Sequence, residues 1–286
     1  MTVEKGVRVV SCAAVNTTGT DDAATCWPRD SAAPPTCAAF TFQGVAFAVP
    51  FALFWFAGKI RPSLVPKLSL VLALGGLQGV VGWYMVSSGL AERIDVSQYR
   101  LALHLLIAFA ILGCLIWLIL GEQPVHAEPR LQTLTPLQRA WAYGLAALVF
   151  SQVALGGFVA GLKAGRAYNT WPLMDGRVIP DGFLRLDPWW LNFTENMAAV
   201  QFNHRIAAYA IVALALWHAV RLLRTADDER IARSALALAV GVCAQMVLGI
   251  FTVLWAVPIG LGIAHQGLAA IVFAIAIWHA HTVARA

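Results

Sequence analysis

Charged residues are scarce in this sequence. Only 12% of the residues are Asp, Glu, Lys or Arg, against about 25% in soluble globular proteins, whereas 59% are hydrophobic and the mean hydropathy is +0.70. This shortage excludes an ordinary soluble domain. The net charge of +5 comes from basic residues in short segments between apolar runs, so it does not form the continuous basic patch of a nucleic-acid-binding protein. We therefore expect no nucleic-acid partner.

The long apolar runs also lack period-2 alternation, and the five cysteines form no CxxC motif. The first absence excludes a membrane β-barrel, and the second excludes a cysteine-ligated metal centre. A helix needs about 20 residues to cross a bilayer. Seven runs reach this length, namely residues 37–58, 66–88, 98–120, 137–162, 197–223, 231–257 and 259–283. The sequence therefore predicts an all-α membrane protein, a bundle of seven transmembrane helices in a lipid bilayer.

The connections between these runs predict the orientation of the bundle. Lys and Arg gather in the segments 59–67, 121–139 and 221–233, which places those segments in the cytoplasm by the positive-inside rule. Residues 162–194, here called the lid segment, then lie outside. A long loop in a compact protein is usually functional, and the aromatic, Gly and Pro content of this one predicts a structured lid at the membrane interface. Tryptophans that only anchor the protein in the interface would give a similar composition.

Histidines in the apolar runs are the main candidates for chemistry, because ionisable residues inside a membrane are costly and usually functional. His104, His204 and His265 lie near the predicted outer ends of their runs. The other four histidines lie near inner helix ends or in a loop, and we expect them at the interface or in solvent rather than as ligands. They are His126, His218, His279 and His281.

An internal repeat relates two of the candidate histidines. Aligning residues 78–82 with residues 245–249 places His104 beside His265. The repeat predicts two pseudosymmetric four-helix halves, an incomplete first half at 37–120 and a complete second half at 121–286, after a disordered or atypical N-terminus at 1–36. In the second half His204 and His265 are predicted at one depth, as needed to grip a heme iron from both faces. Zinc is disfavoured, because no carboxylate or cysteine stands at a suitable helical spacing.

Several motifs around these histidines resemble heme A synthases of the alphaproteobacterial and mitochondrial type. The resemblance runs from about Gly44 to the C-terminus. The matching stretches are residues 75–79, 82–86 and 88–90, then 96–100 with His104, then 169–176, 195–196, 200–205 and 264–266.

The resemblance implies a fold, an activity and a set of site residues. Such enzymes have eight helices in two halves and oxidise the C8 methyl of heme O to the formyl group of heme A, for cytochrome c oxidase. The match implies that His204 and His265 are iron ligands of a heme b cofactor. It makes His104 a catalytic residue that ligates the iron of the substrate heme. The family's first helix and a first-half Glu-x-x-His-Arg motif are expected to be missing here, since Thr36 occupies the histidine position of that motif.

Two other functions are compatible with a bis-histidine heme site, a b-type electron-transfer cytochrome and a non-catalytic heme-binding assembly factor of the oxidase. The resemblance names heme O as the substrate and makes heme O synthase and oxidase assembly factors candidate partners. The alanine-rich composition favours the bacterial inner membrane over the mitochondrial inner membrane. Whether copies of the chain form a homo-oligomer is left open.

Overall fold

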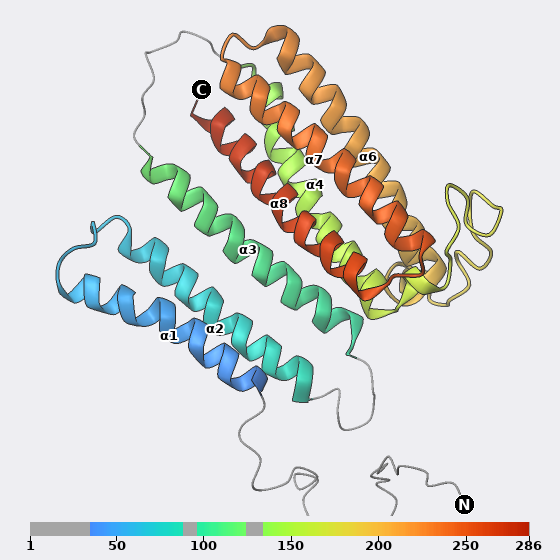
Figure 1. The fold of residues 1–286 in the computed structure, drawn as a ribbon, viewed down its shortest axis with the longest axis horizontal. Coiled ribbons are helices and arrows are strands. Elements are labelled where there is room, and N and C mark those ends of the chain that lie inside the picture. The colour runs from blue at the N-terminus through green and yellow to red at the C-terminus, as the bar shows by residue number, and fades with distance from the viewer. Residues whose placement is uncertain (1–34, 88–95, 124–133, 286) are drawn as a thin grey trace, which may run out of the picture. The chain divides into compact units, whose positions relative to one another are not determined.

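The computed structural model describes residues 35–87, 96–123 and 134–285, with side chains from Gly44 onward (Figure 1). The expectation of disorder in residues 1–36 falls almost wholly outside this part of the chain, as do His126, Cys12 and Cys26. Within the described residues the protein is helical, without a β-strand. The long helices are α1 (Pro35–Phe56), α2 (Val65–Ser87), α3 (Gln98–Glu122), α4 (Pro136–Gly161), α6 (Met197–Thr225), α7 (Glu229–Leu254) and α8 (Ile259–Ala284).

These helices confirm the predicted all-α membrane bundle. Six of them, α2, α3, α4, α6, α7 and α8, are long and apolar enough to cross a membrane. The part of α1 with described side chains, Gly44–Phe56, is apolar but shorter. Most boundaries agree with the sequence to within two residues, but α7 ends at Leu254, whereas the apolar run continues to residue 257. Ala256 and Val257 adopt left-handed backbone angles before Pro258, and so turn the chain directly into α8.

The helix that carries His204 has a defined start. Asn196 precedes α6, and its side-chain oxygen accepts hydrogen bonds from the backbone N–H groups of Ala198 and Ala199. These donors have no partner inside the helix, so an N-cap asparagine stabilises this first turn. The cap fixes the point at which the lid side of the molecule enters the membrane helix, and hence the height of His204.

Four helices form a closed ring in the order α4, α6, α7, α8, in which each packs on two neighbours. Helices α6 and α8 therefore stand diagonally opposite each other (Figure 1). Helix α3 packs against both α4 and α8, and α2 packs against α3. The contact of α3 with α4 is close, since a Cβ at Gly157 or Gly161 would lie 2.9 Å and 2.5 Å from the Cα atoms of Ala102 and Gln98.

The hydrophobic core is concentrated at the end of the ring opposite the lid segment. It includes Leu145 of α4, Leu222 of α6, Leu238 of α7 and Phe273 of α8. Toward the lid segment, residues 243–251 of α7 and 259–271 of α8 include no buried residue, whereas Ala198, Ala199 and Val200 at the lid end of α6 are buried. The lid-end parts of α7 and α8 are therefore more exposed than the parts of these helices that contribute to the core.

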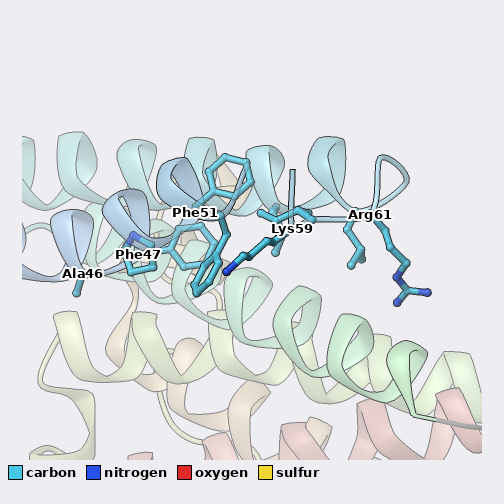
Figure 2. A pocket seen from close by; sticks show the side chains of 10 residues that line it. Ala46, Phe47, Phe51, Lys59 and Arg61 are labelled. Carbon is cyan, nitrogen blue, oxygen red and sulfur yellow. The ribbon is translucent and has the colours of Figure 1, made fainter. Parts of the chain in front are cut away.

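A separate hollow of about 430 Å³ is lined by residues of α1, α2 and the turn between them (Figure 2). Phe47 and Phe51 contribute aromatic rings, while Lys59 and Arg61 lie at the turn. None of the candidate histidines His104, His204 and His265 lines this hollow, so it is distinct from the site described next.

Candidate functional site

His204 lies near the lid end of α6 and is held by a residue of α4. The side-chain nitrogen of Gln152 donates to the backbone carbonyl of His204 at 2.8 Å and lies 3.1 Å from the ring nitrogen Nδ1. Gly156, one turn further along α4, faces the same ring, and a Cβ there would lie 3.4 Å from its Cε1 atom. The imidazole of His204 is thus held by a glutamine and fits beside a glycine.

His265 on α8 has the same surroundings, supplied by α7. The side-chain nitrogen of Gln245 donates to the His265 carbonyl at 2.9 Å and lies 3.3 Å from each ring nitrogen. A Cβ at Gly249 would lie only 2.9 Å from the ring atom Cε1. Any larger residue at Gly249 would have to displace the imidazole.

The two imidazoles are carried by diagonal helices, and each contacts a glutamine of a neighbouring helix of the ring. Both histidines lie in the lid-side halves of their helices. Among the described residues no group of three or more His, Cys, Asp or Glu side chains could hold a bare metal ion. Two imidazoles on diagonal helices of one ring, each beside a glycine, instead fit an iron whose other ligands would come from a macrocycle.

His104 lies on α3, outside the ring, and its partner is on α2. The side-chain nitrogen of Gln78 lies 3.2 Å from Nε2 of His104. The α2–α3 hairpin therefore repeats the glutamine–histidine contact of the α7–α8 hairpin, as the sequence repeat suggested. The structure brings His204 and His265 together in one ring and places His104 on the helix packed beside it.

The lid segment is structured, as predicted, and two polar residues of α6 attach it to the bundle. Arg205, only 9% exposed, donates to the carbonyl oxygens of Thr170 and Tyr168 at 2.9 and 3.0 Å. Gln201, one turn earlier, also donates to the Tyr168 carbonyl. Arg205 is adjacent to His204. The same helical turn therefore carries a candidate metal ligand, His204, and the arginine that holds the lid segment.

A second attachment joins the lid end of α6 to α3. The Tyr99 hydroxyl donates to a carboxylate oxygen of Glu195 at 2.8 Å and lies 2.9 Å from the Thr194 hydroxyl. Tyr99 precedes His104 on α3, and Glu195 belongs to the short helix α5 (Asn192–Glu195) just before α6. The two histidine-bearing helices are therefore linked directly at the lid end.

The expectation that His218, His279 and His281 are interfacial or solvated was wrong with respect to burial. They are 2%, 0% and 7% exposed. His218 and His279 meet across the ring with their Nε2 atoms 3.0 Å apart, and Nδ1 of His279 lies 2.9 Å from the Ser234 hydroxyl. Position near a helix end did not reveal this, because the partners come from three different helices.

The proton positions in this cluster follow from its contacts. The Ser234 hydroxyl lies 2.9 Å from the Ile231 carbonyl, to which it donates, so it accepts from Nδ1–H of His279. The Nε2 atom of His279 is then an acceptor, and His218 donates to it. His218 follows His204 by the same 14 residues as His279 follows His265, so the bonded inner pair aligns α6 and α8 and sets the outer pair at one depth.

Substituting His279 by leucine is expected to lower the stability of the folded protein, because it leaves the buried N–H donor of His218 without an acceptor. The cost of one such group is about 1–3 kcal/mol. The double variant His218→Leu/His279→Leu should lose less than the single one, since Ser234 keeps its bond to Ile231. Thermal unfolding in detergent measures both, and a double variant as unstable as the sum of the two single variants would contradict this account.

Comparison with known proteins places the chain in a family. The sequence profile of COX15-CtaA, described as cytochrome oxidase assembly protein, matches residues 40–277. The chain belongs to this family. The match covers α2, α3, α4, α6 and α7 and continues into α8 as far as residue 277, so all three candidate histidines lie within the family's region.

Relatives in the same family are heme A synthases from alphaproteobacteria, as the sequence resemblance predicted. Those from Chelativorans sp. strain BNC1 and Parvibaculum lavamentivorans are 49% and 48% identical over 239 and 242 residues, 83% and 85% of this chain. The one from Allorhizobium ampelinum is 48% identical over 236 residues, 82% of this chain. The aligned regions span 65%, 68% and 64% of these relatives.

Sequence reasoning missed several residues of the site. Gln152 and Gly156 have the same spacing as Gln245 and Gly249, a signal that a search for the repeat in residues 137–162 would have found. The hydrogen bonds of Arg205 and Tyr99 could not be found in this way. Their partners lie in and beside the lid segment, where the sequence has no repeating pattern.

Proposed function

We propose that the chain acts in the synthesis of heme A, as the oxidoreductase that converts the C8 methyl of heme O into a formyl group. The observation that carries this proposal is the glutamine–histidine contact present both in the ring and on the α2–α3 hairpin. It supports two heme-related sites in one chain, a cofactor site and a substrate site. Relatives named heme A synthase support the choice of reaction.

We assign His204 and His265 as the iron ligands of heme b. The assignment is supported by the diagonal placement of their helices, the glycine beside each imidazole and the glutamine that contacts each of them. When bound, heme b would supply electron transfer. The chain's own contribution is to orient the two imidazoles through Gln152 and Gln245 and to hold the lid segment against α6 through Arg205 and Gln201.

We assign His104 to the substrate side, as a catalytic residue at the iron of heme O. Gln78 fixes its ring, and α3 packs against α4 and α8, next to the proposed cofactor site. Converting a methyl to a formyl group replaces two C–H bonds by a C=O bond; with water as the source of the oxygen atom, the change releases four electrons and four protons, which need an acceptor. An electron-transfer group beside the substrate is therefore required, and the packing of α3 on the ring supports this arrangement.

The cellular setting follows from the same proposal. The multi-pass helical bundle and the bacterial relatives support the inner membrane of a bacterium as its location. Heme O is the substrate, so an enzyme that makes heme O and the assembly factors of cytochrome c oxidase are the expected partners. The lipid bilayer is the solvent of the apolar helix faces.

Heme extraction tests the proposal. The full chain is expressed in a bacterial host that makes heme O but whose own heme A synthase gene is deleted, and the hemes are separated and identified by mass. We expect heme A to form and the purified protein to carry heme b. A purified protein without any heme would overturn the proposal.

The two alternative functions give different results in the same experiment. Retained heme b without formation of heme A would favour a b-type electron-transfer cytochrome. Retained heme, no heme A and co-purification with oxidase subunits would favour a non-catalytic assembly factor. The variant His104→Ala separates these cases from the enzyme, because it should abolish heme A formation and leave the heme b spectrum intact.

A further inference from the structure

Each of the three candidate histidines is contacted by a glutamine from the preceding membrane helix. Gln78 of α2 lies 3.2 Å from a ring nitrogen of His104, Gln152 of α4 lies 3.1 Å from one of His204, and Gln245 of α7 lies 3.3 Å from both of His265. A polar amide in an apolar helix needs a hydrogen-bonding partner. The nitrogen contacted differs, since Gln78 contacts Nε2, Gln152 contacts Nδ1 and Gln245 lies equally near both, but in each case a glutamine amide lies against the imidazole.

A glycine follows each glutamine by four residues, at Gly82, Gly156 and Gly249. Residues four apart lie on the same face of a helix, so the glycine faces the ring that the glutamine contacts. The distances from a built Cβ to Cε1, 3.4 Å at Gly156 and 2.9 Å at Gly249, show this directly. The motif Gln-x-x-x-Gly combines a polar contact to the imidazole with the space into which the imidazole fits.

The hydrogen bonds also show an acceptor without a donor. The side-chain nitrogens of Gln152 and Gln245 face their histidines and donate to the histidine carbonyls. Their carbonyl oxygens Oε1 are buried and have no hydrogen-bond partner in the part of the chain that the structure describes. A half-turn of either amide would exchange this oxygen with the side-chain nitrogen, and so place an acceptor beside the histidine ring.

A histidine that held an iron would present a donor to such an acceptor. An imidazole that binds iron through Nε2 carries its proton on Nδ1, and a hydrogen-bond acceptor usually holds this proton and orients the ring. We propose that Gln152 and Gln245 are positioning residues of the two axial histidines, each accepting the Nδ1 proton at Oε1 after a half-turn of its amide. The inference rests on the proposed heme b site and adds how its ligands are held.

The choice of glutamine has a chemical consequence. An amide can donate through its nitrogen or accept through its oxygen without gaining a charge, which matters where an unpaired charge would be costly. A neutral acceptor leaves the ligand a neutral imidazole, whereas a carboxylate would draw the Nδ1 proton and make the ligand more anionic. Because an anionic ligand stabilises ferric iron, the acceptor at this position sets the reduction potential of the bound heme.

The test uses the full chain purified with its heme, in the variants Gln152→Leu and Gln152→Glu. The leucine variant should retain heme about 10–100-fold less tightly and have a higher midpoint potential, because Nδ1–H loses its acceptor. The glutamate variant should restore retention and lower the potential below that of the wild type. The same pair of changes at Gln245 should act in the same directions.

Matched controls exist at Gln266, which is exposed and adjacent to His265 in the sequence. Gln266→Leu should leave retention and potential unchanged, and Gln266→Glu measures the effect of a nearby charge that does not contact the ring. A merely structural role of Gln152 would make its leucine and glutamate variants shift the potential in the same direction, or not at all, and either result would overturn the inference.

These outcomes are separate from those that test the enzyme. A protein that holds heme b with opposite potential shifts, but forms no heme A, keeps the inference and loses the proposed reaction. Heme A formation with unchanged potentials keeps the reaction and loses the inference. A wild-type protein without heme overturns both.

Discussion

Replacing His265 by alanine is expected to leave a folded protein that no longer retains heme b. Loss of a direct iron ligand should weaken retention by more than the roughly 10–100-fold that follows from loss of a residue behind a ligand. His265 lies in a stretch of α8 without buried residues and outside the hydrophobic core, so the substitution leaves that core intact. The measurement is the heme-to-protein ratio and the reduced-minus-oxidised absorbance spectrum of the purified variant.

The matched control is His281→Ala. His281 lies on the same helix, is 7% exposed and packs edge-on against Trp117 at the opposite end from the lid segment. This variant should retain heme at the wild-type level, although its stability is expected to fall. Equal heme loss in both variants would mean that heme binding responds to damage in α8 generally, and would argue against His265 as a ligand.

Replacing Arg205 by alanine is expected to free the lid segment from the ring. The guanidinium makes two bonds to backbone carbonyls, and hydrogen bonds to charged groups contribute about 1.5–3 kcal/mol each. Losing the free energy of even one of these hydrogen bonds should increase the population of the open lid segment by at least about tenfold. Limited proteolysis within residues 162–194, followed by mass spectrometry, measures this opening.

Arg205→Lys is the companion variant, because lysine keeps the charge but cannot reach both carbonyls with a planar fork. It should lie between the wild type and the alanine variant in cleavage rate. His204 is the neighbouring residue, so heme retention is measured in parallel. Unchanged cleavage in Arg205→Ala would show that Gln201 and the other lid contacts hold the segment without the arginine.

Much of the site was predictable because the repeat consists of the same residue types at the same spacing within single helices. The spacing of Gln78 and Gly82 matches that of Gln245 and Gly249, and it predicted equivalent places for His104 and His265. The structure confirms the equivalent glutamine contacts. A membrane helix has a fixed rise per residue, so positions along it convert directly into depth.

The buried histidine pair shows where this conversion fails. Depth along α6 and α8 placed His218 and His279 near helix ends, and depth alone favoured contact with water. Their burial is decided by the neighbouring helices. Helices α4 and α7 close the ring around them, and Ser234 of α7 supplies an acceptor. Lateral neighbours depend on which helices pack together, and no spacing within one helix contains that information.

The sequence by itself determined the all-α membrane class, the positions of the seven long helices, the repeat and the three candidate histidines. Composition and spacing are properties of single segments, and a bilayer leaves few other folds for such segments. The tertiary structure decided that α6 and α8 are diagonal, that the inner histidines bond to each other while the outer ones each contact a glutamine, and that Arg205 holds the lid segment. These features depend on contacts between residues far apart in the chain, which form only when the helices pack.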